Sequence, residues 1–217
     1  MNKINLSNKK EIKNQSKLWD RQYSLHKTLW HFQTENISDK IKGKNVLELG
    51  VGDGKTLRAI LRKRPKKVIA IDFSQEAIKK CKAQFKENNL HFANANITKL
   101  PFEDSKFDVI FCYYVLNNLP GTDRRKSIAE IHRVLRKKGV LFFEDFSAGD
   151  FREETGKKIE NHTVKKKNGI ICHFFKINEI NALFSKFSKK ELKLRVTKPI
   201  THKNNLIRKT ISGVILK

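Results

Sequence analysis

Long hydrophobic runs and cysteine are both scarce in this 217-residue sequence. No apolar stretch approaches the ~20 residues of a membrane-spanning helix, and residues 1–17 lack the apolar core of a signal peptide. The three cysteines, Cys81, Cys112 and Cys172, are far apart, so they form neither a disulfide framework nor a metal-ligand pattern. We therefore expect no membrane span, no bound metal and a cytoplasmic location.

Acidic residues are few beside basic ones. The sequence has 22 Asp and Glu against 47 Lys and Arg, a net charge of +25. Basic residues cluster at 62–67, 124–126, 136–138 and 165–167. Such charge favours an RNA partner, tRNA included. The alternative is an AT-rich genome, which makes Lys, Asn and Ile abundant together and leaves the clusters as solvated faces. Whether the clusters share one face, and the oligomeric state, stay open.

The composition indicates one folded unit. Hydrophobic residues make up 38% of the chain, enough for a full core, and no internal repeat or long linker divides it. We expect a helical cap over residues 1–43 and a single domain over 44–217. The cap carries large aromatics, among them Trp19, Tyr23 and Trp30. It either packs on the core or forms a lid that places these rings near a bound cation or an incoming base.

Residues 45–56 predict a ligand site. A short apolar strand containing Glu48 leads into three alternating glycines, Gly50, Gly52 and Gly54. Glycine lets a ligand lie against bare backbone, and the next helix presents free N–H groups there. Glu48 can accept hydrogen bonds from a cationic or hydroxyl-rich ligand. Loops of this kind also serve as tight turns or in NAD sites.

A second apolar strand ends in Asp72. A carboxylate at this place suits two ribose hydroxyls, each of which donates a hydrogen bond. Because Ser74 and Gln75 follow, Asp72 is alternatively the cap of the next helix.

Four segments in order resemble the class I S-adenosylmethionine-dependent methyltransferases. The first is residues 46–56, the second is 70–74, the third is 94–102 together with 107–110, and the fourth is 130–139. The resemblance implies an α/β, Rossmann-like fold with a mostly parallel seven-stranded sheet and helices on both faces. It implies S-adenosylmethionine as cofactor, with the glycine loop around its methionine part, Asp72 on the ribose and Asn96 accepting from the adenine amino group. The further cofactor residues that it implies are Phe73, Ile97 and Tyr113.

The pattern also predicts the elements of this fold. We expect helices at 55–64, 74–88, 122–137 (ended by Gly139) and 177–187, strands at 45–49, 67–72, 90–95, 107–113 and 140–143, and a closing antiparallel pair around 192–196 and 211–215.

The substrate is less clear. Residues 117–120, Asn-Asn-Leu-Pro, differ from the loop of adenine-N6 methyltransferases, and Cys112 lies inside a strand, unlike the nucleophile of pyrimidine-C5 enzymes. Residues 144–152, 168–175 and 208–214 resemble the tRNA 3-methylcytidine methyltransferases. Glu144 stands where those enzymes often carry Arg, and His173 where they carry an aromatic.

A carboxylate near the acceptor would stabilise the cation that methylation of cytosine N3 produces. Asp145 is the first catalytic candidate and Glu144 the second, although either can instead cap a loop or pair with Arg152. His173 is a further residue that can face the pocket. We expect methylation of an RNA base, with a small-molecule methyltransferase (quinone, lipid precursor or other metabolite) and a non-catalytic RNA-binding subunit as the alternatives.

Overall fold

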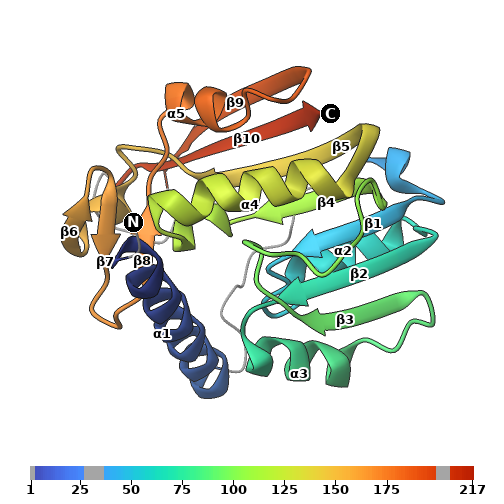
Figure 1. Cartoon of the computed structure of the whole chain (residues 1–217), viewed down its shortest axis with the longest axis horizontal. Helices are drawn as coiled ribbons and strands as arrows, with labels where there is room; N and C mark the ends of the chain where they lie inside the picture. Colours follow the sequence, from blue (N-terminus) through green and yellow to red (C-terminus); the bar gives the residue numbers. More distant parts are fainter. Residues whose placement is uncertain (1–2, 27–36, 199–205) are drawn as a thin grey trace.

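The computed structural model describes residues 3–26, 37–198 and 206–217 and contains a seven-stranded sheet (Figure 1). The strand order is β3-β2-β1-β4-β5-β10-β9. Neighbours from β3 to β5 pair in parallel, whereas β10 is antiparallel to both β5 and β9. The predicted sheet and its closing pair are confirmed. The strands are β1 Asn45–Leu49, β2 Lys67–Asp72, β3 Leu90–Asn94, β4 Phe107–Tyr113, β5 Leu135–Phe146, β9 Lys189–Thr197 and β10 Arg208–Leu216.

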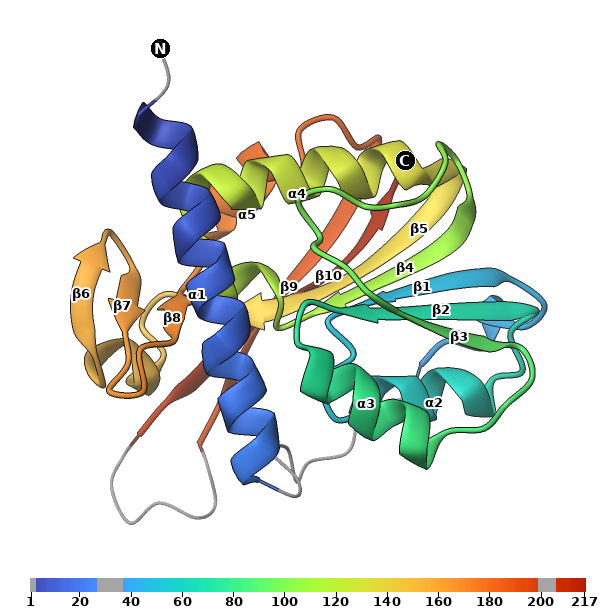
Figure 2. The same ribbon diagram turned by 60° about the horizontal axis from the view of Figure 1, so that its bottom comes forward.

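Helices cover both faces of the sheet. Figure 2 shows α4 (Gly121–Val134) and α5 (Ile177–Leu183) on one face and α2 (Lys55–Arg62) and α3 (Gln75–Gln84) on the other. Each pair buries its apolar side chains in a separate core cluster against the sheet. The two-faced arrangement leaves the carboxyl ends of β1, β2 and β4 together at one edge, which is where ligands bind in such sheets.

The end predicted for the helix at residues 122–137, which is α4, is wrong. The helix ends at Val134, and β5 begins at once, so that Gly139 lies within β5 and does not end the helix. Leu135 pairs with Phe107, and the ladder resumes where Val140 pairs with Val109. The extra residues of β5 between these pairs interrupt the ladder and shift its register, which sequence periodicity does not reveal.

The helix predicted at residues 74–88, which is α3, also ends earlier than predicted. Phe85 leaves the helix in an extended conformation and enters the core, where it is 6% exposed. A buried aromatic beyond the helix end therefore overrides the helical pattern of the residues that follow.

A small antiparallel sheet and a long helix flank the carboxyl edge of the main sheet. The small sheet consists of β6 (Lys157–Glu160), β7 (Thr163–Lys165) and β8 (Ile171–His173), and α1 (Lys3–Leu25) crosses between it and β1–β3 (Figure 2). Three short 3₁₀ helices complete the described elements: η1 Asp39–Ile41, η2 Leu116–Asn118 and η3 Phe151–Glu154.

The predicted N-terminal helical cap is present as α1. Its buried Gln15 bonds the small sheet: the amide nitrogen donates to Gly169 O (3.1 Å), and the amide oxygen accepts from Ile171 N (3.2 Å). Trp30, which we expected in this cap, lies outside the described residues. In the described part of the chain, no helix has the length and apolar character to cross a membrane.

Candidate active site

A cavity of about 450 Å³ opens at the carboxyl edge of the sheet and is bordered on one side by Trp19 and Tyr23 of α1. This volume falls in the range of about 300–1,000 Å³ of small-molecule sites. Nine of the predicted cofactor residues line it: Trp19, Tyr23, Gly50, Gly52, Asp72, Phe73, Asn96, Ile97 and Tyr113. The structure thus brings together residues from five separate stretches of the sequence.

The glycine loop depends on glycine for both conformation and space. Gly50, Gly52 and Gly54 have φ values of 67°, 56° and 79°, in the left-handed region. A Cβ on Gly50 would lie 2.6 Å from Val115 Cγ2, and one on Gly52 would lie 2.8 Å from the Tyr23 hydroxyl oxygen. Side chains from two other elements therefore close tightly over the backbone of this loop.

Asp72 links the glycine loop to the second strand. Its two carboxylate oxygens accept hydrogen bonds from Gly52 N and Ser74 N, both at 2.9 Å. Burial raises the pKa of Asp72 to about 6. The cap of α3 is Ser74, whose hydroxyl accepts from Ala77 N at 3.2 Å, so Asp72 is not the helix cap. Each carboxylate oxygen retains a second acceptor position for a ligand hydroxyl.

Glu48 and Gly54 do not line the cavity. Glu48 is 2% exposed, and burial, followed by the charge of Asp72, raises its pKa well above the usual range. Its Oε2 atom is buried without a hydrogen-bond partner among the described residues. Gly54 begins α2, with Phe85 and Cys81 filling the space beside it. The structure thus places these two residues outside the cavity lining, and their contact with a ligand stays a prediction.

Asn96 lines the cavity with a different hydrogen-bonding pattern from the one that the resemblance implied. Its Oδ1 already accepts from Thr98 N (2.9 Å) and Thr98 Oγ1 (3.0 Å). Because an amide oxygen has two lone pairs, both are in use. The amide NH₂ is therefore the group suited to a ligand, as a donor to a ring nitrogen and not as an acceptor from an amine.

The aromatic residues of α1 cover the glycine loop. Trp19 and Tyr23 stack on each other, with ring centroids 5.6 Å apart and planes at 29°. Both line the cavity, and Tyr23 is buried. Their placement agrees with the lid interpretation of the N-terminal helix.

Two polar residues hold this lid in place and were missed in the sequence. Ser16 Oγ donates to the carbonyl oxygen of Phe73 at 3.0 Å. Asp20 Oδ1 accepts from Ser74 Oγ at 2.7 Å and from Glu76 N at 3.2 Å. The helical spacing of Ser16 and Asp20 beside Trp19 and Tyr23 is the signal that would have identified them, since residues four apart share a helix face.

The far wall of the cavity comes from β5, β9 and β10 and from the loop after β4. Tyr114 Oη donates to Glu144 Oε1 at 2.5 Å, and burial, followed by the charge of Glu144, holds the pKa of Tyr114 above its usual range. Arg195 and Arg208 lie on the same wall and were not predicted. This wall therefore combines a carboxylate, a phenol and two guanidinium groups.

Asp145 does not belong to the cavity. Successive residues of a strand point to opposite faces, so Glu144 lines the cavity and Asp145 does not. Asp145 is fully buried and accepts from Asn117 N (3.1 Å) and Phe146 N (2.9 Å). Burial raises its pKa well above the usual range. The ranking of Asp145 above Glu144 as the catalytic carboxylate was wrong, because a buried core group has no contact with a substrate in the cavity.

The structure decides against two further alternatives that the sequence left open. Arg152 pairs with Asp150 at 2.6 Å, and not with Glu144 or Asp145. His173 is buried away from the cavity lining, hydrogen-bonded to Thr163 Oγ1 (2.7 Å) and to Glu179 (2.9 Å). Both residues stabilise the region around the small sheet.

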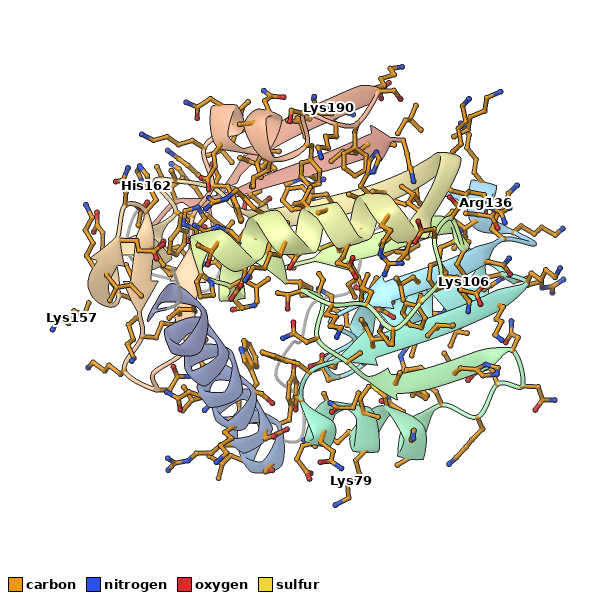
Figure 3. All side chains as sticks on the ribbon, in the orientation of Figure 1. Lys79, Lys106, Arg136, Lys157, His162 and Lys190 are labelled. Carbon is orange, nitrogen blue, oxygen red and sulfur yellow. The ribbon has the colours of Figure 1, made fainter. Side chains whose placement is uncertain are left out.

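The basic clusters do not form one face. Residues 62–67 and 136–138 lie at the amino ends of the strands, whereas residues 165–167 begin at the last residue of β7, near the carboxyl edge. In Figure 3, Lys106 and Arg136 project on one side of the molecule and Lys157 on the opposite side. Arg124, of the remaining cluster, is buried. Among the described residues, the basic side chains that line the cavity are Lys55, Arg195 and Arg208, which lie outside the four clusters.

Comparisons with known proteins agree with this geometry. The family described as a methyltransferase domain matches residues 47–143. A tRNA N(3)-methylcytidine methyltransferase, Mettl2 of Drosophila melanogaster, is 27% identical over 83% of this chain and 63% of its own length. The ubiquinone/menaquinone biosynthesis C-methyltransferase UbiE of Vibrio campbellii is 32% identical over 55% of this chain and 48% of its own length.

A solved structure shows the same fold. The SAM-dependent methyltransferase from Methanosarcina mazei has a TM-score of 0.65 at 20% identity, over 82% of this chain and 94% of that chain. The chain spans less than two thirds of the length of the curated relatives named above. The matched methyltransferase domain, the strand order and the glycine loop beside Asp72 together support a class I S-adenosylmethionine-dependent methyltransferase.

Proposed function

We propose that the chain methylates a base of RNA, in the first place of tRNA, with S-adenosylmethionine as methyl donor. The observation that carries the proposal is the cationic wall of the cavity. Arg195, on β9, and Arg208, on β10, line the same cavity as the glycine loop. Guanidinium groups bind phosphate oxygens in bidentate geometry. The similarity to Mettl2, which covers 83% of this chain, supports the same substrate class.

The residues of the cavity fit S-adenosylmethionine. Asp72 has acceptor positions for two ribose hydroxyls, and the bare backbone at Gly50 and Gly52 admits the methionine part. Trp19 and Tyr23 offer aromatic faces, which attract a cation such as a sulfonium. When bound, the cofactor supplies a methyl group on a positively charged sulfur.

The chain itself supplies alignment, exclusion of water and one carboxylate. A ring nitrogen such as N3 of cytosine carries a lone pair, so no strong general base is required. Glu144, fixed by the 2.5 Å hydrogen bond from Tyr114, stands on the acceptor side of the cavity, where a carboxylate stabilises a base that becomes positively charged. Trp19 and Tyr23 of α1 border this cavity, and a side chain that shields such a carboxylate from water strengthens the interaction.

A small-molecule acceptor is the second candidate. Six aromatic side chains line the cavity, two of them from α1, and such side chains suit a site that encloses an apolar ring. The similarity to UbiE over 55% of this chain favours an acceptor of the quinone class. Turnover of such an acceptor would be nearly insensitive to salt.

Tritium transfer from labelled S-adenosylmethionine tests the proposal. Bulk tRNA from a host that lacks the gene and a small-molecule extract are offered in one reaction and then separated. We expect label in tRNA. Label in the extract alone would overturn the RNA proposal in favour of the second candidate. If neither fraction is labelled and the cofactor does not bind, the chain is a non-catalytic subunit.

A further inference from the structure

The loop after β4 contains a backbone conformation that most side chains avoid. Tyr114 has a φ of 58°, in the left-handed region, where a residue with a Cβ is strained. Asn118 Nδ2 donates a hydrogen bond to the carbonyl oxygen of Tyr114 at 2.9 Å. Asn118 is the last residue of η2, and both residues line the cavity. Strain of this kind persists only where neighbouring contacts hold it, and it is concentrated at functional sites.

Tyr114 is bonded to Glu144 twice. The backbone N of Tyr114 donates to the carbonyl oxygen of Glu144 at 2.8 Å, and its hydroxyl donates to Oε1 at 2.5 Å. The tyrosine ring also packs on Phe146, two residues further along β5, with ring centroids 5.0 Å apart. The backbone, the hydroxyl and the ring of one residue therefore restrict the Glu144 side chain to one orientation.

One oxygen of Glu144 is left for an acceptor. Burial, followed by the charge of Glu144, raises the pKa of Tyr114 above its usual range, so its hydroxyl stays protonated and donates at neutral pH. This bond occupies Oε1. The other oxygen, Oε2, has no hydrogen bond or ion pair among the described residues and is not buried. Since Glu144 lines the cavity, Oε2 is the atom that an acceptor meets.

The same loop also touches the cofactor side of the cavity. Val115, the residue after Tyr114, covers the glycine loop so closely that a Cβ on Gly50 would lie 2.6 Å from Val115 Cγ2. Tyr114 and Val115 thus connect the wall that carries Glu144 to the loop that binds the methyl donor. Methyl transfer depends on the alignment of donor and acceptor, and a misplacement of about 1 Å can slow a reaction about a hundredfold.

We propose that Tyr114 is a positioning residue that sets the Glu144 carboxylate against the acceptor, and that Asn118 braces its strained backbone. The proposal rests on the role of Glu144 in the proposed function. Tyr114 acts through Glu144 and requires no contact of its own with the acceptor. The arrangement serves any acceptor that becomes positively charged on methylation, whether it is an RNA base or a small molecule.

A double-mutant cycle separates this role from a structural one. Tyr114→Phe removes the hydroxyl and keeps the ring, and Glu144→Gln keeps an acceptor oxygen and removes the charge. The initial rate of label transfer at saturating S-adenosylmethionine is measured with the fraction that takes the label, bulk tRNA or the small-molecule extract. We expect the rate to fall about tenfold in Tyr114→Phe and about a hundredfold in Glu144→Gln, with the KM for S-adenosylmethionine unchanged.

The double variant gives the decisive comparison. If Tyr114 acts through Glu144, the double variant should lose the same factor of about a hundred as Glu144→Gln alone. Independent effects would multiply to a loss of about a thousandfold, and this outcome would overturn the proposal.

The brace is tested in the same way. Asn118→Asp keeps the size of the side chain but replaces the donor with an acceptor, so the carbonyl oxygen of Tyr114 loses its partner. The rate should fall about tenfold in the native chain and hardly further when Tyr114→Phe is already present. Asn88→Asp, at an exposed asparagine, should leave the rate unchanged. A full additional loss beside Tyr114→Phe would overturn the role of Asn118 as the brace.

Nuclear magnetic resonance tests the contact without turnover. The sequence contains three tyrosines, so labelling of the tyrosine ζ carbon with ¹³C gives three signals, and Tyr114→Phe identifies that of Tyr114. Glu144→Gln should shift this signal and leave the other two in place, because the hydroxyl then donates to a neutral oxygen. An unmoved Tyr114 signal would overturn the proposal.

The outcomes separate this proposal from the proposed function. Label in the extract alone would overturn RNA as the substrate, and the cycle run with the extract would still decide the role of Tyr114. Additive losses with tRNA would overturn the role of Tyr114 and leave the RNA substrate intact. If neither fraction takes the label, both proposals fall.

Discussion

At the residue scale, Asp72 connects the parts of the cofactor site, because it bonds the glycine loop at Gly52 and the start of α3 at Ser74. Its pKa is raised by burial from 3.8 to about 6. In a group with a raised pKa, the protonated form is favoured in the folded protein. The resulting stability is complete below pH 3.8 and is lost as the pH rises through about 6, at a cost on the order of 3 kcal/mol.

Cofactor binding should have the opposite pH dependence. Ribose hydroxyls donate to the ionised carboxylate, so the affinity for S-adenosylhomocysteine should rise as the pH passes through about 6 and then level off. The rise should approach tenfold per pH unit below 6. Isothermal titration between pH 5 and 8 measures it.

The variant Asp72→Asn should bind S-adenosylhomocysteine at least tenfold more weakly at pH 7.5, because it loses charge-assisted hydrogen bonds of about 1.5–3 kcal/mol. Its affinity should no longer rise as the pH passes through about 6. Asp39→Asn, at an exposed carboxylate, is the control. An unchanged dissociation constant in Asp72→Asn would contradict the assignment of Asp72 to the ribose.

The sequence predicted these residues unequally. Asp72 and the glycines could be predicted because an apolar strand, a glycine loop and a second apolar strand succeed one another in the sequence. The distinction between Glu144 and Asp145 depends on which face of β5 borders the cavity, and two adjacent acids carry no signal for that. Arg195 and Arg208 were missed because they reach the cavity through antiparallel pairing of distant strands.

At the scale of elements, α1 and the glycine loop form one closed unit through Tyr23. Gly52→Ala should lower both thermal stability and cofactor affinity, because its left-handed φ is strained and its Cβ would meet the Tyr23 hydroxyl at 2.8 Å. Gly43→Ala is the matched control, with φ +70° and open space around the Cβ position. Both variants should lose about 1–2 kcal/mol from backbone strain.

Gly52→Ala should lose a further ~1–3 kcal/mol from crowding. Chemical denaturation of the two variants measures the difference. Equal losses would show that Tyr23 does not close over the loop.

The anchoring of α1 makes a separate prediction. Asp20→Ala removes the acceptor for Ser74 Oγ and Glu76 N, and should cost about 1 kcal/mol of docking free energy. Amides of α1 should then exchange faster with deuterium, and the cofactor should bind several-fold more weakly. Arg21→Ala, at the exposed neighbour, should leave both unchanged. Unaltered exchange in Asp20→Ala would mean that other contacts hold the lid.

The elements themselves differ in how well sequence predicts them. The parallel strands are mostly buried apolar runs, and β1, β2 and β4 have the predicted bounds. The small sheet was not predicted as a unit, because β6 is short, polar and exposed and β7 has only three residues. Helix ends depended on tertiary contacts, such as the burial of Phe85 beyond α3.

At the scale of the whole molecule, the positive charge is spread over opposite ends of the sheet, and only part of it borders the cavity. Methylation of tRNA should therefore decline steeply with salt, and Arg195→Gln and Arg208→Gln should each reduce the slope of log(kcat/KM) against log[salt] by about 0.7–0.9. Lys66→Gln, at the amino edge, should leave the slope unchanged. A slope lowered equally by all three variants would indicate nonspecific attraction by the net charge alone.

One measurement tests the central claim most directly. Bulk tRNA is incubated with the protein and trideuteromethyl S-adenosylmethionine, digested to nucleosides and analysed by mass spectrometry. We predict one deuterium-labelled base, a methylated cytidine, that forms with the native chain and is lost with Asp72→Asn. Absence of label from every nucleoside, with labelled product in a small-molecule extract under the same conditions, would contradict the claim that this cavity serves RNA.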